Sequence, residues 1–374
     1  MQSIIIAVQH TTMSFITTPN GLLKTKQHFE ILDGLRGLAA IAVVIFHFME
    51  FATPDYKDNF IAHAYLAVDF FFCLSGFVIA YAYDHKLANL GIIPFLKLRF
   101  IRLHPLVIIG SVIGVLAFIF DPFSKLQDVY GYGQTFILFI SSCFMVPYPL
   151  VQERYFNLFH LNPPTWSLFW EYLANIVYAL VLIKLPNKVL WVLTIFAAVL
   201  LGFEAQKAGY LGVGWGGDNF FGGGIRVLFS FLSGILVYRS KWIIRSKLGF
   251  VSMGILLLVV FLVPFSKANA IIDPLLVIFY FPFLVALGAG ATLQPKLSKI
   301  CKFSGDISYP LYVIHYPFVW LFLSYIEVKK TDMAIMQILI PIGTIALVLL
   351  AYGVLVFMDL PIRKYPKKIM FKSV

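Results

Sequence analysis

Residues 335–358 read IMQILIPIGTIALVLLAYGVLVFM, a run without a charged side chain. An α-helix rises about 1.5 Å per residue, so about 20 apolar residues cross the hydrocarbon core of a bilayer. Further apolar runs occur at Leu106–Phe120, Val189–Leu201 and Phe250–Val263. The sequence therefore predicts an all-α integral membrane protein.

The overall composition supports a chain that is surrounded by lipid. Of its 374 residues, 60% are hydrophobic and 13% are charged, whereas a soluble domain carries about 25% charge. The net charge of +11 could indicate a nucleic-acid partner, but the basic residues are spread over the connections between apolar runs instead of forming one stripe. Cys73, Cys143 and Cys301 stand alone without CxxC spacing. We therefore expect the bilayer as a partner, no nucleic acid and no metal.

The distribution of Lys and Arg tests how many apolar segments cross the membrane, because cytoplasmic loops carry the excess. Eleven segments are candidates: 35–51, 65–83, 100–120, 135–150, 166–183, 189–203, 224–239, 248–264, 271–289, 306–326 and 335–358. If all cross, 13 basic residues lie inside and 16 outside. If 135–150 instead dips in and returns through Val151–Pro164, the division is 21 inside and 8 outside. About ten transmembrane helices plus one re-entrant segment is the better model.

This topology also predicts the organisation of the chain. Residues 1–29 lack the layout of a signal peptide and form an amino-terminal extension, residues 30–365 form the membrane domain, and residues 366–374 form a basic cytoplasmic tail. Both termini are then cytoplasmic, in a multi-pass protein of the cell membrane. A non-helical backbone at membrane depth has to be shielded by protein or line a wet cavity, so residues 135–164 are expected to cover a cavity.

Charged side chains inside the predicted spans are candidates for function, because each costs several kcal/mol at bilayer depth. Arg36 and His47 are eleven residues apart on the first span, which returns to within about 20° of the same helical face and advances about 16 Å. Both can face one cavity, with His47 deeper. The alternatives are an arginine that snorkels to the interface and a histidine that bonds a neighbouring helix.

Two carboxylates are predicted near the depth of His47. Asp69 follows the start of the second span, and Glu171 lies in Trp166-Ser-Leu-Phe-Trp-Glu171 at the start of a span that also descends from outside. A carboxylate that accepts the imidazole N–H would fix the tautomer and raise the basicity of a general base. Alternatively, Asp69 caps a helix and Glu171 pairs with an arginine.

Two arginines on one face predict a phosphate site at the cytoplasmic end of the third span. Arg99 and Arg102 are three residues apart, so they share a helical face, and guanidinium groups bind phosphates bidentately. Positive charge at the end of a span also serves as an ordinary topology signal. Farther along the chain, the polar residues Ser308, Tyr312 and His315 form one helical stripe. His315 either bonds a backbone carbonyl or contacts substrate.

Together these motifs resemble the acyltransferase-3 family of membrane acyltransferases. The resemblance rests on Arg36 and His47, on Val-Asp69-Phe-Phe-Phe-Cys-Leu-Ser75-Gly76-Phe, on Arg99-x-x-Arg102 with Pro105, on Trp166-Ser-Leu through Glu171, and on Ile-Ser308-Tyr309-Pro-Leu-Tyr-Val-Ile-His315. These motifs follow the family's order from residue 30 to about residue 365.

The resemblance implies that the protein transfers an acetyl or other short acyl group from cytoplasmic acetyl-CoA to a hydroxyl of a sugar or related acceptor. Arg99 and Arg102 would bind the phosphates of the coenzyme and Arg36 would guide its pantetheine arm. His47, supported by Asp69 and Glu171, would either deprotonate the acceptor or carry the acyl group itself. Substrate contacts are implied at four further residues: Ser75, Trp166, Tyr309 and His315.

A transporter or flippase of a glycan or lipid precursor is the alternative function, because it also needs a polar cavity among many spans. Such proteins often consist of two related halves. No internal repeat is found in this sequence, which favours the enzyme.

Overall fold

The computed structural model describes residues 28–364. The expected amino-terminal extension lies outside these residues except for its last two positions, and the expected basic tail lies outside them entirely. Within 28–364 the chain forms helices and no named strand, so the expected all-α fold is confirmed for this part. The helices are α1 Glu30–Ala52, α2 Ala67–Tyr83, α3 Leu87–Leu90, α4 Ile92–Ile119, α5 Leu126–Cys143, α6 Thr165–Leu180, α7 Asn187–Ala208, α8 Phe220–Arg239, α9 Phe250–Phe261, α10 Asn269–Leu275, α11 Phe281–Gly290, α12 Pro295–Ile314, α13 Tyr316–Lys329 and α14 Met333–Val354.

Fewer helices than expected meet the requirements of a complete membrane span. Within residues 28–364, seven helical stretches are long and apolar enough to cross a bilayer, or eight if α12 and α13 count together as one bent span. The expected number of about ten is therefore not confirmed. Two of the ten expected crossings, 166–183 and 248–264, correspond to α6 with 16 residues and α9 with 12, and both are shorter than a complete span. The segment expected to be re-entrant includes the end of α5, which is kinked at Gly131.

The expected span 306–326 is broken in the structure. Helix α12 ends at Ile314, α13 starts at Tyr316, and the two axes are bent by 53°. Pro317 lies in the first turn of α13, where its missing N–H is tolerated and its fixed φ favours a new helix start. The break leaves His315 at the corner between the two helices.

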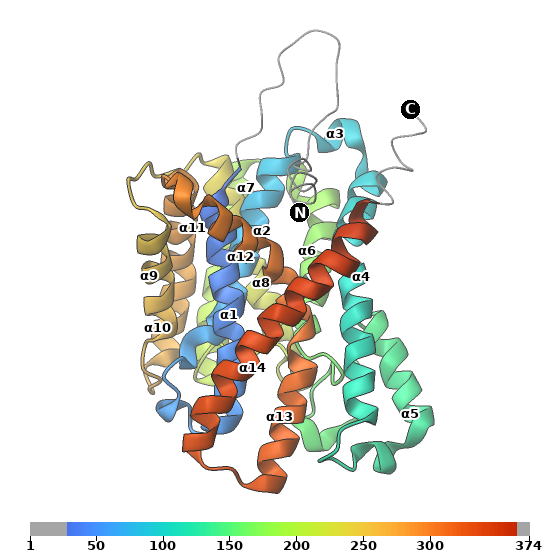
Figure 1. The fold of residues 1–374 in the computed structure, drawn as a ribbon. Helices are drawn as coiled ribbons and strands as arrows, with labels where there is room; N and C mark the ends of the chain where they lie inside the picture. Colours follow the sequence, from blue (N-terminus) through green and yellow to red (C-terminus); the bar gives the residue numbers. More distant parts are fainter. Residues whose placement is uncertain (1–27, 365–374) are drawn as a thin grey trace, which may run out of the picture.

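Close helix packing places the polar residues of the core. Helix α1 packs on α12, and α2 packs on α8. A Cβ atom at Gly37 of α1 would lie 1.8 Å from Oγ of Ser304, and one at Gly234 of α8 would lie 1.9 Å from the carbonyl oxygen of Cys73. Only glycine allows these two crossings, as in other membrane helix pairs with small residues at the interface. Helix α14 runs diagonally across α1 in the view of Figure 1.

Contacts between connecting segments define two ends of the helical bundle. At the first, called the Arg239 end, Arg239 forms an ion pair with Asp84 at 2.7 Å and donates to the carbonyl of Leu185 at 3.0 Å. At the second, called the Arg154 end, Arg154 donates to Ser324, which donates to Asp121, each at 2.6 Å.

Helix α1 runs from the Arg239 end to the Arg154 end. Near its start, the ring of Phe29 packs on Tyr81, which in turn packs on Tyr238 beside Arg239. Near its end, the ring of Phe51 stacks on Tyr155, 5.9 Å away. Arg36 and His47 therefore lie toward opposite ends of the bundle.

Candidate active site

His47 forms its closest polar contact with Glu50, one turn farther along α1. Nδ1 of His47 lies 2.8 Å from Oε1 of Glu50. The two residues are three positions apart, so the helix itself holds them on one face. The side chains are 21% and 14% exposed, so little solvent competes for this contact. An ionised Glu50 accepts the Nδ1 proton, and the lone pair is then on Nε2.

Two tyrosines hold the Glu50 carboxylate in place. Tyr316 of α13 donates to Oε1 at 3.2 Å, and Tyr56, in the connection after α1, donates to Oε2 at 3.3 Å. Burial, and then the Glu50 charge, raise the pKa of Tyr56 well above its usual value, so this hydroxyl stays protonated. The ring of Tyr316 also packs edge-on against His47, with 4.7 Å between the centroids. Glu50 is therefore fixed from three elements.

His315 lies against His47 at the corner between α12 and α13. The two imidazole rings stack with centroids 5.3 Å apart. Nδ1 of His315 contacts the carbonyl oxygens of Tyr312 at 2.9 Å and Leu311 at 3.1 Å, as the backbone alternative for this residue predicts. Its Nε2 is buried and has no hydrogen-bond partner within residues 28–364. This nitrogen can therefore act as an acceptor toward a bound group.

Asp69 does not contact His47, contrary to the expected grouping, because it is held by Arg226 of α8. Nη2 of Arg226 lies 2.6 Å from Oδ2 of Asp69, and both side chains are buried. Arg226 also donates to the carbonyl oxygens of Val213 and Tyr65, at 2.8 and 2.9 Å. Asp69 thus neutralises a buried arginine that joins α8 to two connecting segments.

Glu171 also lies apart from His47. It forms an ion pair with Arg99 at 3.1 Å and accepts a hydrogen bond from Ser75 at 2.9 Å. Arg99 also donates to Asn175, one turn farther along α6, at 3.0 Å. The alternative in which Glu171 pairs with an arginine is the one the geometry matches. The expected meeting of His47, Asp69 and Glu171 is not formed in the structure.

The three arginines expected to bind the coenzyme lie close together. Arg36 of α1 donates to Ser308 and to the carbonyl of Gly305 on α12, both at 2.8 Å. The positive charge of Arg102 interacts unfavourably with those of Arg36 and Arg99. Two helices, α1 and α4, therefore bring three guanidinium groups toward one region, where a bound anion would relieve the repulsion on Arg102.

The two other expected substrate residues have partners in the protein. The hydroxyl of Tyr309 donates to the carbonyl of Leu103 at 2.6 Å, so it joins α12 to α4 beside Arg102. Trp166 lies under the guanidinium of Arg226, 5.4 Å from its ring centroid, and is buried. Trp166 therefore belongs to the surroundings of the Asp69 ion pair and not to those of His47.

Three residues of the His47 environment were absent from the prediction: Glu50, Tyr56 and Tyr316. Glu50 carried a usable signal, because it follows His47 by three positions on the same helical face. No local pattern points to Tyr56 or Tyr316, because their contacts with Glu50 depend on how α13 and the connection after α1 fold back.

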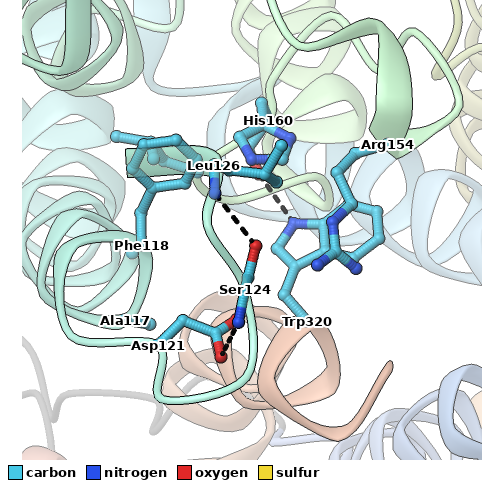
Figure 2. Close-up of a pocket in the computed structure, with 10 residues that line it drawn as sticks. Ala117, Phe118, Asp121, Ser124, Leu126, Arg154, His160 and Trp320 are labelled. Atoms are coloured by element: carbon cyan, nitrogen blue, oxygen red, sulfur yellow. Dashed lines mark hydrogen bonds between the residues drawn. The ribbon is translucent and has the colours of Figure 1, made fainter. Parts of the chain in front are cut away.

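A small cavity of about 20 Å³ lies at the Arg154 end. Figure 2 shows Arg154, His160 and Trp320 on one side of it and Asp121 with Ser124 on the other. Arg154 and His160 belong to the irregular segment 144–164 between α5 and α6, part of the stretch expected to cover a cavity. Within residues 28–364, no three His, Cys, Asp or Glu side chains form a group that could hold a metal ion.

Comparison with known proteins gives one family and two relatives. Residues 29–357 match the family model Acyl_transf_3, described as an acyltransferase domain. The chain is 38% identical over 162 residues to "Protein 2 in picA locus" of Rhizobium radiobacter, which covers 41% of this chain and 82% of that protein. It is 27% identical over 375 aligned residues to the peptidoglycan O-acetyltransferase OatA of Listeria monocytogenes serovar 1/2a, which covers 91% of this chain and 56% of that protein. The chain thus spans about half the length of OatA, and no solved structure matches it.

Proposed function

Because the chain belongs to the acyltransferase-3 family, we propose that it moves an acetyl or other short acyl group from acetyl-CoA to a hydroxyl of a glycan or related acceptor at the membrane. The observation that carries the proposal is the contact of His47 with Glu50 at 2.8 Å, inside a chain with several helices apolar enough to span a bilayer. A half-buried histidine with a carboxylate on Nδ1 is the arrangement that a general base requires.

His47 would act through Nε2. This nitrogen takes the proton of the acceptor hydroxyl while the acceptor oxygen attacks the thioester carbonyl carbon. The carbon–sulfur bond then breaks, and the protonated His47 returns its proton to the leaving thiolate. The products are an ester and the free coenzyme thiol. Throughout, Glu50 stabilises the charged imidazole and holds its tautomer.

Alternatively, Nε2 attacks the thioester itself, so that the acyl group is carried on His47 before the acceptor hydroxyl takes it. Both routes need the Nε2 lone pair and the Glu50 carboxylate. His315 stacks on His47 and has an unpaired Nε2, so this nitrogen is a candidate hydrogen-bond acceptor for a hydroxyl of the acceptor.

The arginine cluster is proposed to bind the donor. The charges of Arg36 and Arg99 repel that of Arg102, and the phosphates of acetyl-CoA would offset that repulsion through bidentate hydrogen bonds. Arg36 precedes His47 by eleven residues on α1, which is about 16 Å along the helix. An extended pantetheine arm can bridge such a distance.

The proposed location is the cell membrane, with both termini and the arginine cluster on the cytoplasmic side. The excess of Lys and Arg in the connections near the Arg239 end supports this orientation. The donor would then enter from the cytoplasm, and the acceptor would meet His47 from the opposite side.

The function is tested by transfer from radiolabelled acetyl-CoA in protein purified into lipid nanodiscs. We expect the wild type to release free coenzyme A and His47→Ala to lose at least about a hundredfold in rate. The control is His85→Ala, since His85 is an exposed histidine outside this site. Wild-type turnover in His47→Ala would overturn the assignment of His47. No turnover by the wild type with any hydroxyl acceptor would favour the transporter.

A further inference from the structure

Two aromatic rings connect the cavity at the Arg154 end to His47. The ring of Tyr316 packs on His47 at 4.7 Å, and the ring of Trp320, which lines the cavity, packs on Tyr316 at 5.0 Å. Along α4, fifteen residues separate Arg99 from Gly114 at the cavity wall, which is about 22 Å. The cavity therefore lies well away from the arginines that are proposed to bind the donor.

Arg154 supplies one free hydrogen-bond donor beside this cavity. The residue is only 5% exposed, and its guanidinium carbon lies 5.2 Å from the ring centroid of Trp320. Nη2 donates to Ser324 at 2.6 Å, whereas Nη1 has no hydrogen-bond partner within residues 28–364. Its contact with Glu327 is long, at 4.0 Å, and that carboxylate is mostly exposed. A buried N–H without an acceptor is energetically costly, so Nη1 is suited to a ligand oxygen.

His160 supplies a second unpaired group. Its Nδ1 is buried and has no hydrogen-bond partner in the described part of the chain. Burial, and then the charge of Arg154, lower the pKa of His160 to about 3, so the ring is neutral at physiological pH. The ring is fixed between Phe118 at 5.4 Å and Trp320 at 5.5 Å. Figure 2 shows this ring arrangement beside Arg154.

The charges beside the cavity are already balanced. Ser324 accepts from Arg154 and donates to Oδ2 of Asp121, so one cation and one anion are joined through a hydroxyl. An anionic ligand would meet the Asp121 carboxylate, whereas a neutral oxygen would not. The volume of about 20 Å³ has room for one small polar group and not for a sugar ring.

We propose that the cavity lined by Arg154, His160 and Trp320 is an acceptor subsite that takes one neutral, hydrogen-bond-accepting substituent of a sugar, such as a hydroxyl or an amide carbonyl. The proposal rests on the proposed function for the identity of the ligand as the acceptor. It adds to that function a contact that selects the acceptor by a substituent other than the hydroxyl that receives the acyl group.

The test is equilibrium binding of radiolabelled N-acetylglucosamine, glucose and glucuronate to the full chain in nanodiscs, without acetyl-CoA. Arg154→Ala removes the free donor. Ala117→Leu reduces the cavity without removing a polar group, since Ala117 lines the cavity. Lys125→Ala is the matched control, because Lys125 is an exposed cation in the connection after α4 and does not line the cavity. Size-exclusion profiles identify variants that fail to fold.

We expect a neutral sugar to bind the wild type, with Kd raised about tenfold or more by Arg154→Ala and by Ala117→Leu and changed less than about twofold by Lys125→Ala. Unchanged binding in Ala117→Leu, preferential binding of glucuronate, or no saturable binding of either neutral sugar would overturn the subsite. Binding is measured without donor, so it can follow this pattern even if transfer fails. If transfer depends on His47 but Arg154→Ala and Ala117→Leu bind the sugars as the wild type does, the subsite is rejected and the proposed function stands.

Discussion

Glu50, and not Asp69 or Glu171, is the carboxylate that touches His47, and the reason is where the competing charges lie. Asp69 faces Arg226, and Glu171 faces Arg99. The helical repeat sufficed to place Arg36 and His47 on one helix. It offered an arginine as the alternative partner of Glu171 but could not identify Arg99, or Arg226 as the partner of Asp69, because both arginines lie on helices distant in the sequence. Only Glu50, on the same helix as His47, was within reach of sequence reasoning.

The Asp69 ion pair gives a prediction at the same scale. Asp69→Asn leaves the buried Arg226 charge without its partner, which typically costs about 3–5 kcal/mol. We expect a marked fall in thermal stability, measured by fluorescence-detected size exclusion in detergent. The double variant Asp69→Leu with Arg226→Met, which removes both charges, should recover part of the loss. A stable but inactive Asp69→Asn protein would instead indicate a catalytic role for Asp69.

At the scale of helices, glycine contacts decide which elements meet. Gly223, the middle one of three consecutive glycines on α8, allows α6 to approach closely, since a Cβ atom there would lie 2.8 Å from Nε1 of Trp170 on α6. Hydropathy located most of the long helices, including α14. It did not reveal the break at His315, because a proline alone does not predict one: Pro105 and Pro341 lie inside the unbroken helices α4 and α14. On the two sides of the corner, α12 and α13 both pack on α1 and on α4, with their axes bent by 53°.

The crossing of α2 and α8 can be tested by filling it. Gly234→Leu should separate the helices, because even a Cβ atom would lie 1.9 Å from a backbone carbonyl oxygen of α2. We expect loss of folded protein or a large fall in melting temperature. The control is Gly202→Leu on α7, where a Cβ atom meets nothing within 4 Å. Equal stability of the two variants would contradict the close packing described for α2 and α8.

Across the whole molecule, connecting segments that lie at the same end of the bundle are those that the count of Lys and Arg assigned to the same side of the membrane. Asp84 and Arg239 meet at one end, and Asp121 and Arg154 lie at the other. This separation could be predicted from the sequence because the count uses all Lys and Arg residues together and does not depend on the contacts of any one of them. The number of complete spans was less accessible, since short helices such as α9 depend on their neighbours for shielding.

The orientation in the membrane is predicted by the same separation. Single cysteines at Lys125 and Lys329, in a background without the three native cysteines, should react with a membrane-impermeant maleimide in intact cells. Cysteines at Lys86 and Lys247 should react only after the membrane is opened. All four positions are exposed in the structure. Labelling of both pairs from the same side would refute the alternating topology.

The most direct measurement is the rate of acyl transfer by Glu50→Gln in nanodiscs at saturating acetyl-CoA. The amide keeps the size of the side chain and removes the charge that stabilises protonated His47. We predict a fall in kcat of about 10²- to 10⁴-fold, with Glu204→Gln on α7 close to the wild type. Full activity in Glu50→Gln would contradict a catalytic pair of His47 and Glu50.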